Sequence, residues 1–349
     1  MLTAAAIKSR ASEMGFDLCG VAAAEAFPEL ARLRTWLERG HAGEMQYLAR
    51  TADKRANPHL VLQHARSVVV TGTIYNVDRP YSVTCEPGEA RIARYAWGDD
   101  YHDLIGRRQH LLLGWMKDAA GEAFHAVSYV DTGPVQEKVF AARAGLGWIG
   151  KNTCLINQEA GSWIFLGVIL CSLDIEPDTP ALDYCGSCTR CLEACPTGAL
   201  VDPYILDATR CISYLTIEVR EAIPSSQRSQ VGEHVYGCDI CQDVCPWNRR
   251  AATSDDPAWL PRAAFDRART IDLWRRSDSD LRTVLKASAM SRAGLRRFRR
   301  NLSVALANSP SPESKAALCD DDRADAPSLA DPTVRAHVEW AKAQSQCTP

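Results

Sequence analysis

Residues 185–196 read CGSCTRCLEACP, a stretch that places four cysteines in the pattern C-x2-C-x2-C-x3-C followed directly by proline: Cys185, Cys188, Cys191 and Cys195. Three thiolates at three-residue spacing can surround one [4Fe–4S] cube from a single loop. The fourth thiolate of such a run ligates the other cube in proteins that hold two clusters. The stretch therefore predicts a small ferredoxin-like domain with two clusters.

A second cysteine group lies further along the chain and supplies the remaining ligands. The motif is repeated with one cysteine missing by Cys238, Cys241 and Cys245, and Cys245 is again followed by proline. Between the two groups lies Cys211. Because the fourth cysteine of each run crosses to the other cube, the eight thiols divide into two sets. Cluster one is expected to take Cys185, Cys188, Cys191 and Cys245, and cluster two Cys195, Cys211, Cys238 and Cys241.

Structural zinc bound by paired C-x-x-C knuckles is the alternative for the same cysteines. Zinc ribbons rarely carry three cysteines in tight succession with a fourth before proline, so the spacing favours iron–sulfur clusters. Six further cysteines lack ligand spacing and are expected to be packing residues or free thiols: Cys19, Cys85, Cys154, Cys171, Cys319 and Cys347.

The remaining sequence indicates a protein of two or three domains and of the α+β class, since 349 residues exceed one small core. Residues 1–175 mix strand-like runs at 67–74, 124–130 and 162–171 with helical spacing over 102–116 and over 134–144, where Pro134 would occupy the first turn. Residues 174–180 are a proline-broken linker, residues 176–250 hold the cysteine motifs, and residues 251–349 are helical and basic.

Composition narrows the class of protein further. The formal net charge is −3 and charged residues make up 24% of the chain, which argues against a surface that is basic throughout. The longest apolar run, around residues 163–170, is far shorter than the roughly 20 residues of a membrane helix. Scattered charges at the N-terminus do not fit a secretory signal, so a cytoplasmic location without membrane contact is expected. In that reducing compartment, metal binding or catalysis explains the cysteines better than disulfides.

Two stretches imitate other motifs. Residues 145–151 read GLGWIGK and satisfy G-x-G-x-x-G, but a helical pattern precedes them, a strand-like one follows, and Asn152 stands where a P-loop has a hydroxyl residue. These glycines are expected to end a helix and to allow close backbone approach. Residues 100–102 nearly form the D-x-H-x-x-G signature of cobalt-ligating proteins, but Gly106 is one residue too far along. His102 is therefore expected to be a helix-start histidine, and any cobalamin would have no protein ligand to cobalt.

Several stretches in one order resemble the epoxyqueuosine reductase family: residues 54–58, 97–102, 130–133, 144–152, 185–200, 210–216 and 236–241. The resemblance is dense over residues 1–250 and looser over residues 296–301. It implies a nitroreductase-like cobalamin domain over 1–175, a ferredoxin-like domain with two [4Fe–4S] clusters over 176–250, and a HEAT-like, tRNA-contacting helical domain over 251–349. It also implies reduction of the epoxide of epoxyqueuosine, at the wobble position of tRNA, to queuosine.

The same resemblance assigns residues to the reaction. Asp131 matches the family's proposed proton donor, and eight residues match cobalamin contacts: Arg55, Asp131, Asn152, Leu155, Ser162, Ser213, Asp239 and Ile240. Opening an epoxide requires a nucleophile at carbon and an acid at oxygen, and only a cofactor can supply two electrons. Asp131 could be that acid if burial raises its pKa. On the residues alone, Asp131 would instead cap a helix that begins near Pro134.

The C-terminal segment carries a basic run of five arginines within nine residues: Arg292, Arg296, Arg297, Arg299 and Arg300. Such a run forms either a solvated helix face or, with a tRNA substrate, a patch that contacts phosphates. We expect the second, together with a monomeric enzyme and a low-potential electron donor of unknown identity. A reductive dehalogenase-like enzyme and a plain ferredoxin-type carrier are the alternatives.

Overall fold

The computed structural model describes residues 2–319 and 323–344. Its N-terminal part is built on a four-stranded antiparallel sheet with the order β1 (Leu18–Ala23), β2 (Ser67–Ile74), β7 (Ile164–Cys171), β4 (Ala126–Tyr129). The central strands β2 and β7 pair along their whole length. The strands predicted at 67–74, 124–130 and 162–171 are confirmed, and the α+β class with them.

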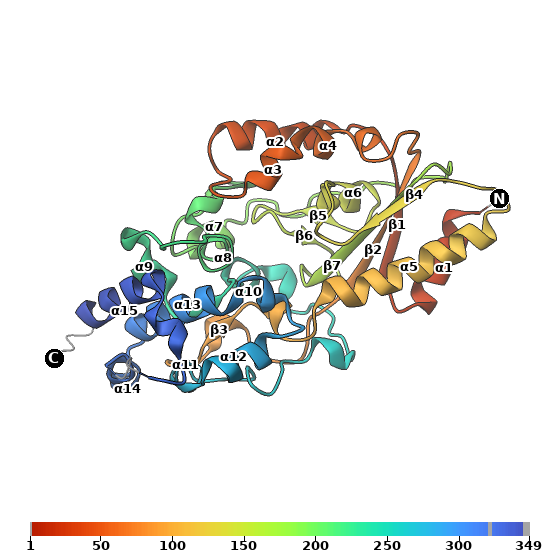
Figure 1. Ribbon diagram of the computed structural model, residues 1–349. Helices are drawn as coiled ribbons and strands as arrows, with labels where there is room; N and C mark the ends of the chain where they lie inside the picture. Colours follow the sequence, from red (N-terminus) through yellow and green to blue (C-terminus); the bar gives the residue numbers. More distant parts are fainter. Residues whose placement is uncertain (1, 320–322, 345–349) are drawn as a thin grey trace.

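Helices cover both faces of this sheet (Figure 1). Alternate residues of a strand point to opposite faces, so Val69 packs against α1 and α5, whereas Val68 and Val70 pack against α6. Burial on both sides explains why the central strands β2 and β7 are largely apolar. The helices of this part are α1 (Ala4–Glu13), α2 (Pro28–Glu38), α3 (Gln46–Arg50), α4 (Ala52–Ala56), α5 (Tyr101–Ala119) and α6 (Glu137–Arg143).

The predicted start of the helix at 134–144 was wrong by three residues. The α6 helix begins at Glu137 with Gln136 as its cap, so Pro134 lies in the preceding loop. This loop requires glycine at position 133, because a Cβ atom there would come within 2.2 Å of the Tyr129 ring. The loop therefore folds onto the end of β4 before the helix can begin.

The cysteine-bearing segment is a small unit of short elements. They are β5 (Trp148–Ile149), β6 (Leu155–Ile156), α7 (Arg190–Ala194), β8 (Leu200–Asp202), β9 (Ile205–Leu206), α8 (Ile212–Ile217), α9 (Ser225–Val231) and α10 (Ile240–Asp243). Its linker is held to the sheet, because the Asp178 carboxylate accepts a hydrogen bond from the Val21 amide and pairs with Lys8. The apolar core here is small and centres on Ile212, Leu215 and Val231.

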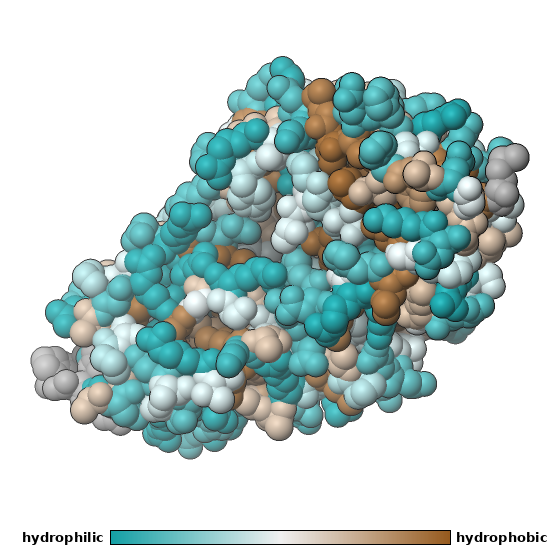
Figure 2. All heavy atoms as spheres, turned by 45° about the vertical axis from the view of Figure 1, so that its right-hand side comes forward, coloured by the Kyte–Doolittle hydropathy of each residue, from teal (hydrophilic) through white to brown (hydrophobic). Residues whose placement is uncertain are grey.

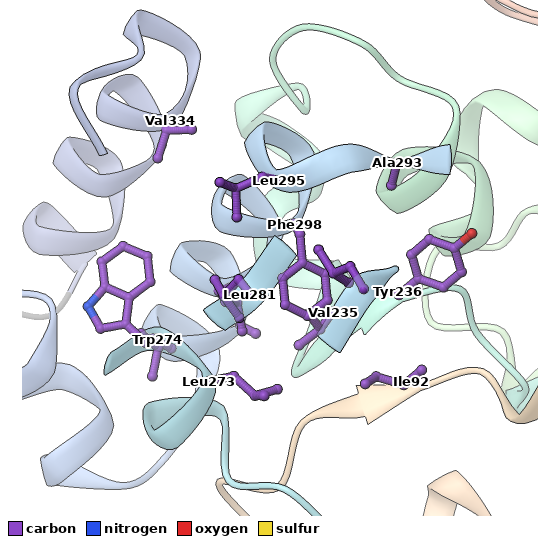
Figure 3. Close-up of a cluster of buried hydrophobic side chains, with 14 of the residues drawn as sticks. Ile92, Val235, Tyr236, Leu273, Trp274, Leu281, Ala293, Leu295, Phe298 and Val334 are labelled. Atoms are coloured by element: carbon purple, nitrogen blue, oxygen red, sulfur yellow. The ribbon is translucent and has the colours of Figure 1, made fainter. Parts of the chain in front are cut away.

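The C-terminal helices form the third unit, whose core includes residues from the first two segments. These helices are α11 (Thr270–Arg275), α12 (Asp278–Leu285), α13 (Gly294–Asn308), α14 (Pro312–Ala317) and α15 (Pro332–Gln344). Phe298 lies at the centre of the core with Trp274 to one side, and Ile92 and Tyr236 enter from the other (Figure 3). Ile92 belongs to β3 (Arg91–Ile92), which pairs in parallel with β10 (His234–Tyr236).

The surface is polar over most of the face drawn in Figure 2, where hydrophobic atoms gather in narrow bands and hollows. None of the helices described here is both long enough and apolar enough to cross a membrane.

Candidate active site and cluster-binding cavities

Eight cysteines line two neighbouring cavities, four in each. The first cavity has a volume of about 250 Å³ and contains Cys185, Cys188, Cys191 and Cys245. The second, of about 240 Å³, contains Cys195, Cys211, Cys238 and Cys241. This is the division that the crossing rule predicts, since Cys195 and Cys245 each leave their own run for the other set. Their ligation of iron stays a prediction.

The glycine-rich loop at 145–151 holds both cysteine loops in place. The Lys151 Nζ atom donates to the carbonyl oxygens of Gly186 at 2.7 Å and Cys188 at 3.0 Å. Asn152 lines both cavities, and its amide donates to the Cys241 carbonyl at 3.2 Å. The α6 helix leads into this loop and the β5–β6 hairpin follows it, so the strand–loop–helix arrangement of a phosphate-binding loop is absent here.

A third cavity, of about 290 Å³, brings Asp131 next to the second set of thiols. It is lined by Asp131, Tyr101, His102, Tyr214 and Arg292, among others. It shares four lining residues with the second thiol cavity: Tyr95, Leu206, Cys211 and Ser213. The two cavities therefore adjoin, with Asp131 on one side and the second thiol set on the other.

The Asp131 side chain is held by two neighbours from the start of α5. Its Oδ2 atom accepts a hydrogen bond from the Tyr101 hydroxyl at 3.1 Å and lies 3.2 Å from His102 Nε2. The α6 cap is Gln136 and no side chain bonds to that helix start, so the interpretation of Asp131 as a helix cap was wrong. The backbone of Asp131 is left-handed, with φ of 60°, and its amide donates to Glu137 Oε1 at 2.7 Å.

His102 lies between two carboxylates. Its Nδ1 atom is 2.7 Å from Asp100 Oδ1, and Asp100 also caps α5 by accepting from the His102 amide. Arg292, 192 residues further along the chain, donates to both oxygens of Asp100 at 2.9 and 3.2 Å. The expectation that His102 lies at the start of a helix is thus confirmed. His102 also connects Asp131, through Asp100, with the C-terminal residue Arg292.

The hydrogen bonds around His102 shift the pKa values of both Asp131 and His102. Burial alone would raise the pKa of Asp131, but the hydrogen bond and charge of His102, with the Tyr101 hydroxyl, bring that pKa below its ordinary value. The condition under which Asp131 alone would be the acid, a raised pKa, is therefore not met. Burial lowers the pKa of His102, but its hydrogen bonds to Asp100 and Asp131 outweigh this and raise it above 6.5. Both shifts favour a proton on His102 beside an ionised Asp131.

Glu137 is the second acidic group beside Asp131. Burial, together with the negative charge of Asp131, raises the pKa of Glu137 to about 8. A carboxyl group with that pKa keeps its proton at neutral pH. The sequence alone gave no reason to single out Glu137. Its carboxyl group reaches the Asp131 amide because the backbone turns back at Asp131 in a left-handed conformation, and this turn is visible only in the structure.

The predicted cobalamin contacts lie in several places around the two cavities. Asn152, Ser213, Asp239 and Ile240 line the second thiol cavity, and Ser213 and Asp131 line the third. The Arg55 guanidinium donates to the Val135 carbonyl at 3.1 Å, in the loop that follows Asp131.

Leu155 and Ser162 line none of the three cavities. Leu155 is buried in the core beneath the sheet, and the Ser162 hydroxyl is hydrogen-bonded to Gln242 and Asn248.

The basic run divides into buried and exposed members. Arg299 and Arg300 are fully buried, so the prediction that they contact phosphate was wrong. Arg299 pairs with Asp278 and donates to the Trp274 carbonyl, and Arg300 donates to three backbone carbonyls.

Arg292 and Arg296 remain 44% and 41% exposed. Arg297 is half-buried and donates to the carbonyls of Ala293 and Ile217.

Cys154 is a residue of the site that spacing did not predict. It lines the second thiol cavity, where it forms a side-chain hydrogen bond with Cys241. Cys171 packs in the sheet core as expected, and Cys347 lies outside the described residues. Ligand spacing could not find Cys154, because the β5–β6 hairpin brings it there from a distant part of the chain.

Comparison with known proteins adds family information to this geometry. A family model described as a 4Fe-4S double cluster binding domain matches residues 184–248, and one described as "Epoxyqueuosine reductase QueG, DUF1730" matches residues 55–132. An epoxyqueuosine reductase of Xanthomonas campestris pv. campestris is 40% identical over 344 residues, which are 98% of this chain and 96% of the relative.

Two solved structures have the same fold over almost the whole chain. A crystal structure of epoxyqueuosine reductase with a tRNA-Tyr epoxyqueuosine-modified stem loop has a TM-score of 0.86 and 31% identity, covering 97% of this chain and 89% of that one. A Bacillus subtilis epoxyqueuosine reductase, with its aspartate-bearing catalytic loop swung out of the active site, has a TM-score of 0.84 and 31% identity with the same coverage.

Proposed function

The chain belongs to the epoxyqueuosine reductase family, and we propose on this basis that it reduces epoxyqueuosine in tRNA to queuosine with cobalamin and two [4Fe–4S] clusters. The reaction takes two electrons and two protons, replaces the epoxide by an alkene and releases the oxygen as water. The observation that carries the proposal is the junction of the Asp131 cavity with the second set of four thiols.

The thiols fit two iron–sulfur cubes in number and grouping. Each cavity presents four cysteines, from two segments in the first cavity and from three in the second, and four are what one cube requires. The Ala199 amide points at Cys195 Sγ at 3.3 Å, and such N–H groups stabilise a ligating thiolate. The 4Fe-4S double cluster family match over residues 184–248 supports the same cofactors.

A corrinoid without a protein ligand to cobalt would lie where the second thiol cavity meets the Asp131 cavity, and Ser213 lines both. Asn152, Ser213, Asp239 and Ile240 would hold it there. His102 offers no free nitrogen for cobalt, since both ring nitrogens face carboxylates. When bound, cobalamin supplies the electron-rich nucleophile at the epoxide carbon that no amino-acid side chain provides.

Asp131 and His102 would supply the proton at the epoxide oxygen. The two pKa shifts favour a proton on His102 beside an ionised Asp131, and Asp131 faces the cavity with 64% of its side chain exposed. As negative charge develops on the epoxide oxygen, a proton passes from this pair to that atom. Arg292 and Asp100 keep the His102 ring oriented, and Tyr101 holds the Asp131 carboxylate.

The tRNA would approach from the side of the exposed arginines. Arg292 lines the Asp131 cavity, and Arg296 lies one turn further along on the same surface. Phosphate contacts from these side chains would position the anticodon loop without reading its sequence. The wobble nucleotide has to leave the stack to enter the cavity, as in other enzymes that modify a base. We further propose a cytoplasmic, monomeric enzyme.

Nucleoside mass spectrometry of tRNA from cells that lack this protein tests the proposal. Epoxyqueuosine should accumulate, the wild-type chain should restore queuosine, and Asp131→Asn should not. Normal queuosine in cells that contain no second reductase would overturn the proposed function.

A further inference from the structure

The first thiol cavity is surrounded by a surface that combines exposed apolar and basic side chains. We call this surface the cluster-one face; it consists of Leu182, Tyr184, Arg190, Val201, Tyr204, Arg249 and Arg250. Leu182 is 70% exposed, and Tyr184, Val201 and Tyr204 are between 40% and 44% exposed. Large apolar side chains gathered around one site in this way mark an interaction surface.

Hydrogen bonds join the parts of this face. The Tyr204 hydroxyl donates to Asp183 at 2.6 Å, and the Tyr204 amide donates to the Lys151 carbonyl at 3.0 Å. Lys151 in turn holds the loop that carries Cys188. The β8–β9 hairpin and the first cysteine run are therefore parts of one surface.

Aromatic rings connect this face with the first set of thiols. Tyr184 and Trp247 both line the first cavity, and their ring centroids are 6.1 Å apart. Trp148 packs edge-on against both rings, at 5.3 and 5.1 Å. Tyr184 thus reaches from solvent to the wall of the cavity that would hold cluster one.

The position of the first cavity makes it the entrance for electrons. It shares Asn152 with the second cavity, and the second cavity in turn adjoins the cavity of Asp131. Electrons that reach the substrate through both clusters must therefore enter at cluster one and leave from cluster two.

The charged side chains that line the first cavity are both positive. Lys151 and Arg190 are the charged residues that line the cavity, and Arg249 and Arg250 are exposed directly after Cys245-Pro246-Trp247-Asn248. Two of the neighbouring acids accept hydrogen bonds within the protein, and Asp202 beside Val201 is exposed. Asp183 accepts from Tyr204 and the Cys185 amide, and Glu193 accepts from the Thr189 hydroxyl.

We propose that the cluster-one face docks a small acidic protein that carries one low-potential electron. Exposed apolar side chains would form the centre of the contact and the three arginines of the face its rim, the arrangement of a transient interface. Each encounter moves one electron from the reduced carrier to cluster one, so two encounters supply one epoxide reduction. This inference rests on the proposed function for the presence of the clusters.

The test uses the anaerobically reconstituted full chain and a photoreduced acidic plant-type [2Fe–2S] ferredoxin as the probe. Stopped-flow absorbance follows cluster reduction in the wild type, in R249E/R250E, and in R107E/K117E on α5, which makes the same charge change on another surface. Dithionite, a small reductant that needs no docking surface, serves as the second electron source. Tyr184 and Arg190 stay unchanged because they line the cavity.

We expect R249E/R250E to lower the second-order rate constant with ferredoxin by roughly tenfold at low ionic strength. The difference should shrink at high salt, where charges are screened over about 3 Å at 1 M. Dithionite should reduce all three proteins at the same rate, and Leu182→Asp should slow ferredoxin at every salt concentration.

Three results would overturn the inference. The first is an equal ferredoxin rate for R249E/R250E and the wild type. The second is an equal loss with dithionite, because the arginines would then act on the cluster itself. The third is an unchanged ferredoxin rate with weaker tRNA binding, which would make the face an RNA contact. Failure of docking would leave dithionite-driven epoxide reduction intact, whereas failure of the proposed function would leave the tRNA unreacted with either reductant.

Discussion

Replacement of Arg300 by methionine is the most direct test of how the C-terminal helix α13 serves the site. Arg300 donates to the backbone carbonyls of Val219, Glu221 and Leu215 at 2.6–2.8 Å. Leu215 lies in α8, whose cap is Cys211 of the second thiol set. The side chain therefore fastens α13 to the helix that carries a predicted cluster ligand.

The structure sets the size of the effect. Methionine keeps most of the aliphatic stem but leaves three carbonyls without their donor, at about 1 kcal/mol each at the lower end of the range for an unsatisfied buried group. We expect the free energy of unfolding to fall by about 3 kcal/mol. The control Arg296→Met, on the same helix but 41% exposed, should change it by less than about 1 kcal/mol.

Anaerobic urea unfolding followed by circular dichroism measures both variants, and fluorescence anisotropy measures their affinity for a tRNA stem-loop. Arg300→Met should unfold at lower urea and bind RNA like the wild type while folded, whereas Arg296→Met should unfold normally and bind RNA more weakly. If Arg300→Met matched Arg296→Met in stability and lost RNA affinity, the assignment of Arg300 to the interior would be refuted.

Three further predictions concern the cofactors and the proton. Cys211→Ala should lower the iron content from about eight to about four atoms per chain, because one four-iron cube loses a ligand; an unchanged iron content would contradict the ligand sets. Asp131→Asn should lower the rate of epoxide reduction roughly 10²–10⁴-fold at unchanged tRNA affinity, measured in single-turnover reactions; an equal loss in affinity would mean that Asp131 binds RNA instead. The wild-type rate should fall as pH rises through the His102 pKa, which lies above 6.5, because the pair then loses its proton; this limb should disappear in His102→Asn, and its persistence there would assign the proton elsewhere.

The parts of the site that spacing could predict are those whose ligands follow one another in the chain. Cys185, Cys188 and Cys191 lie in one loop, and the crossing of Cys195 and Cys245 follows from proline-terminated turns. The two central strands of the sheet were also predictable from consecutive residues, because β2 and β7 are largely apolar runs of strand length.

The parts that the sequence could not predict depend on contacts between distant segments. The bond from Arg292 to Asp100 joins residues 192 apart, so the orientation of His102 is visible only in the folded chain. Arg299 and Arg300 looked like surface charges because a run of arginines usually is solvated. Carbonyls at the ends of other elements bind them instead, and a single sequence does not indicate which carbonyls remain unpaired.

This chain is expected to convert epoxyqueuosine to queuosine at the Asp131 cavity, which adjoins the cavity of the second thiol set. A single-turnover reaction tests it most directly, with the anaerobically reconstituted, cobalamin-loaded chain, dithionite and a stem-loop that contains epoxyqueuosine, read by mass spectrometry. The account predicts a product lighter than the substrate by one oxygen atom, formed by the wild type and lost in Asp131→Asn and Cys211→Ala. An unreacted epoxide with the fully loaded wild-type protein would contradict it.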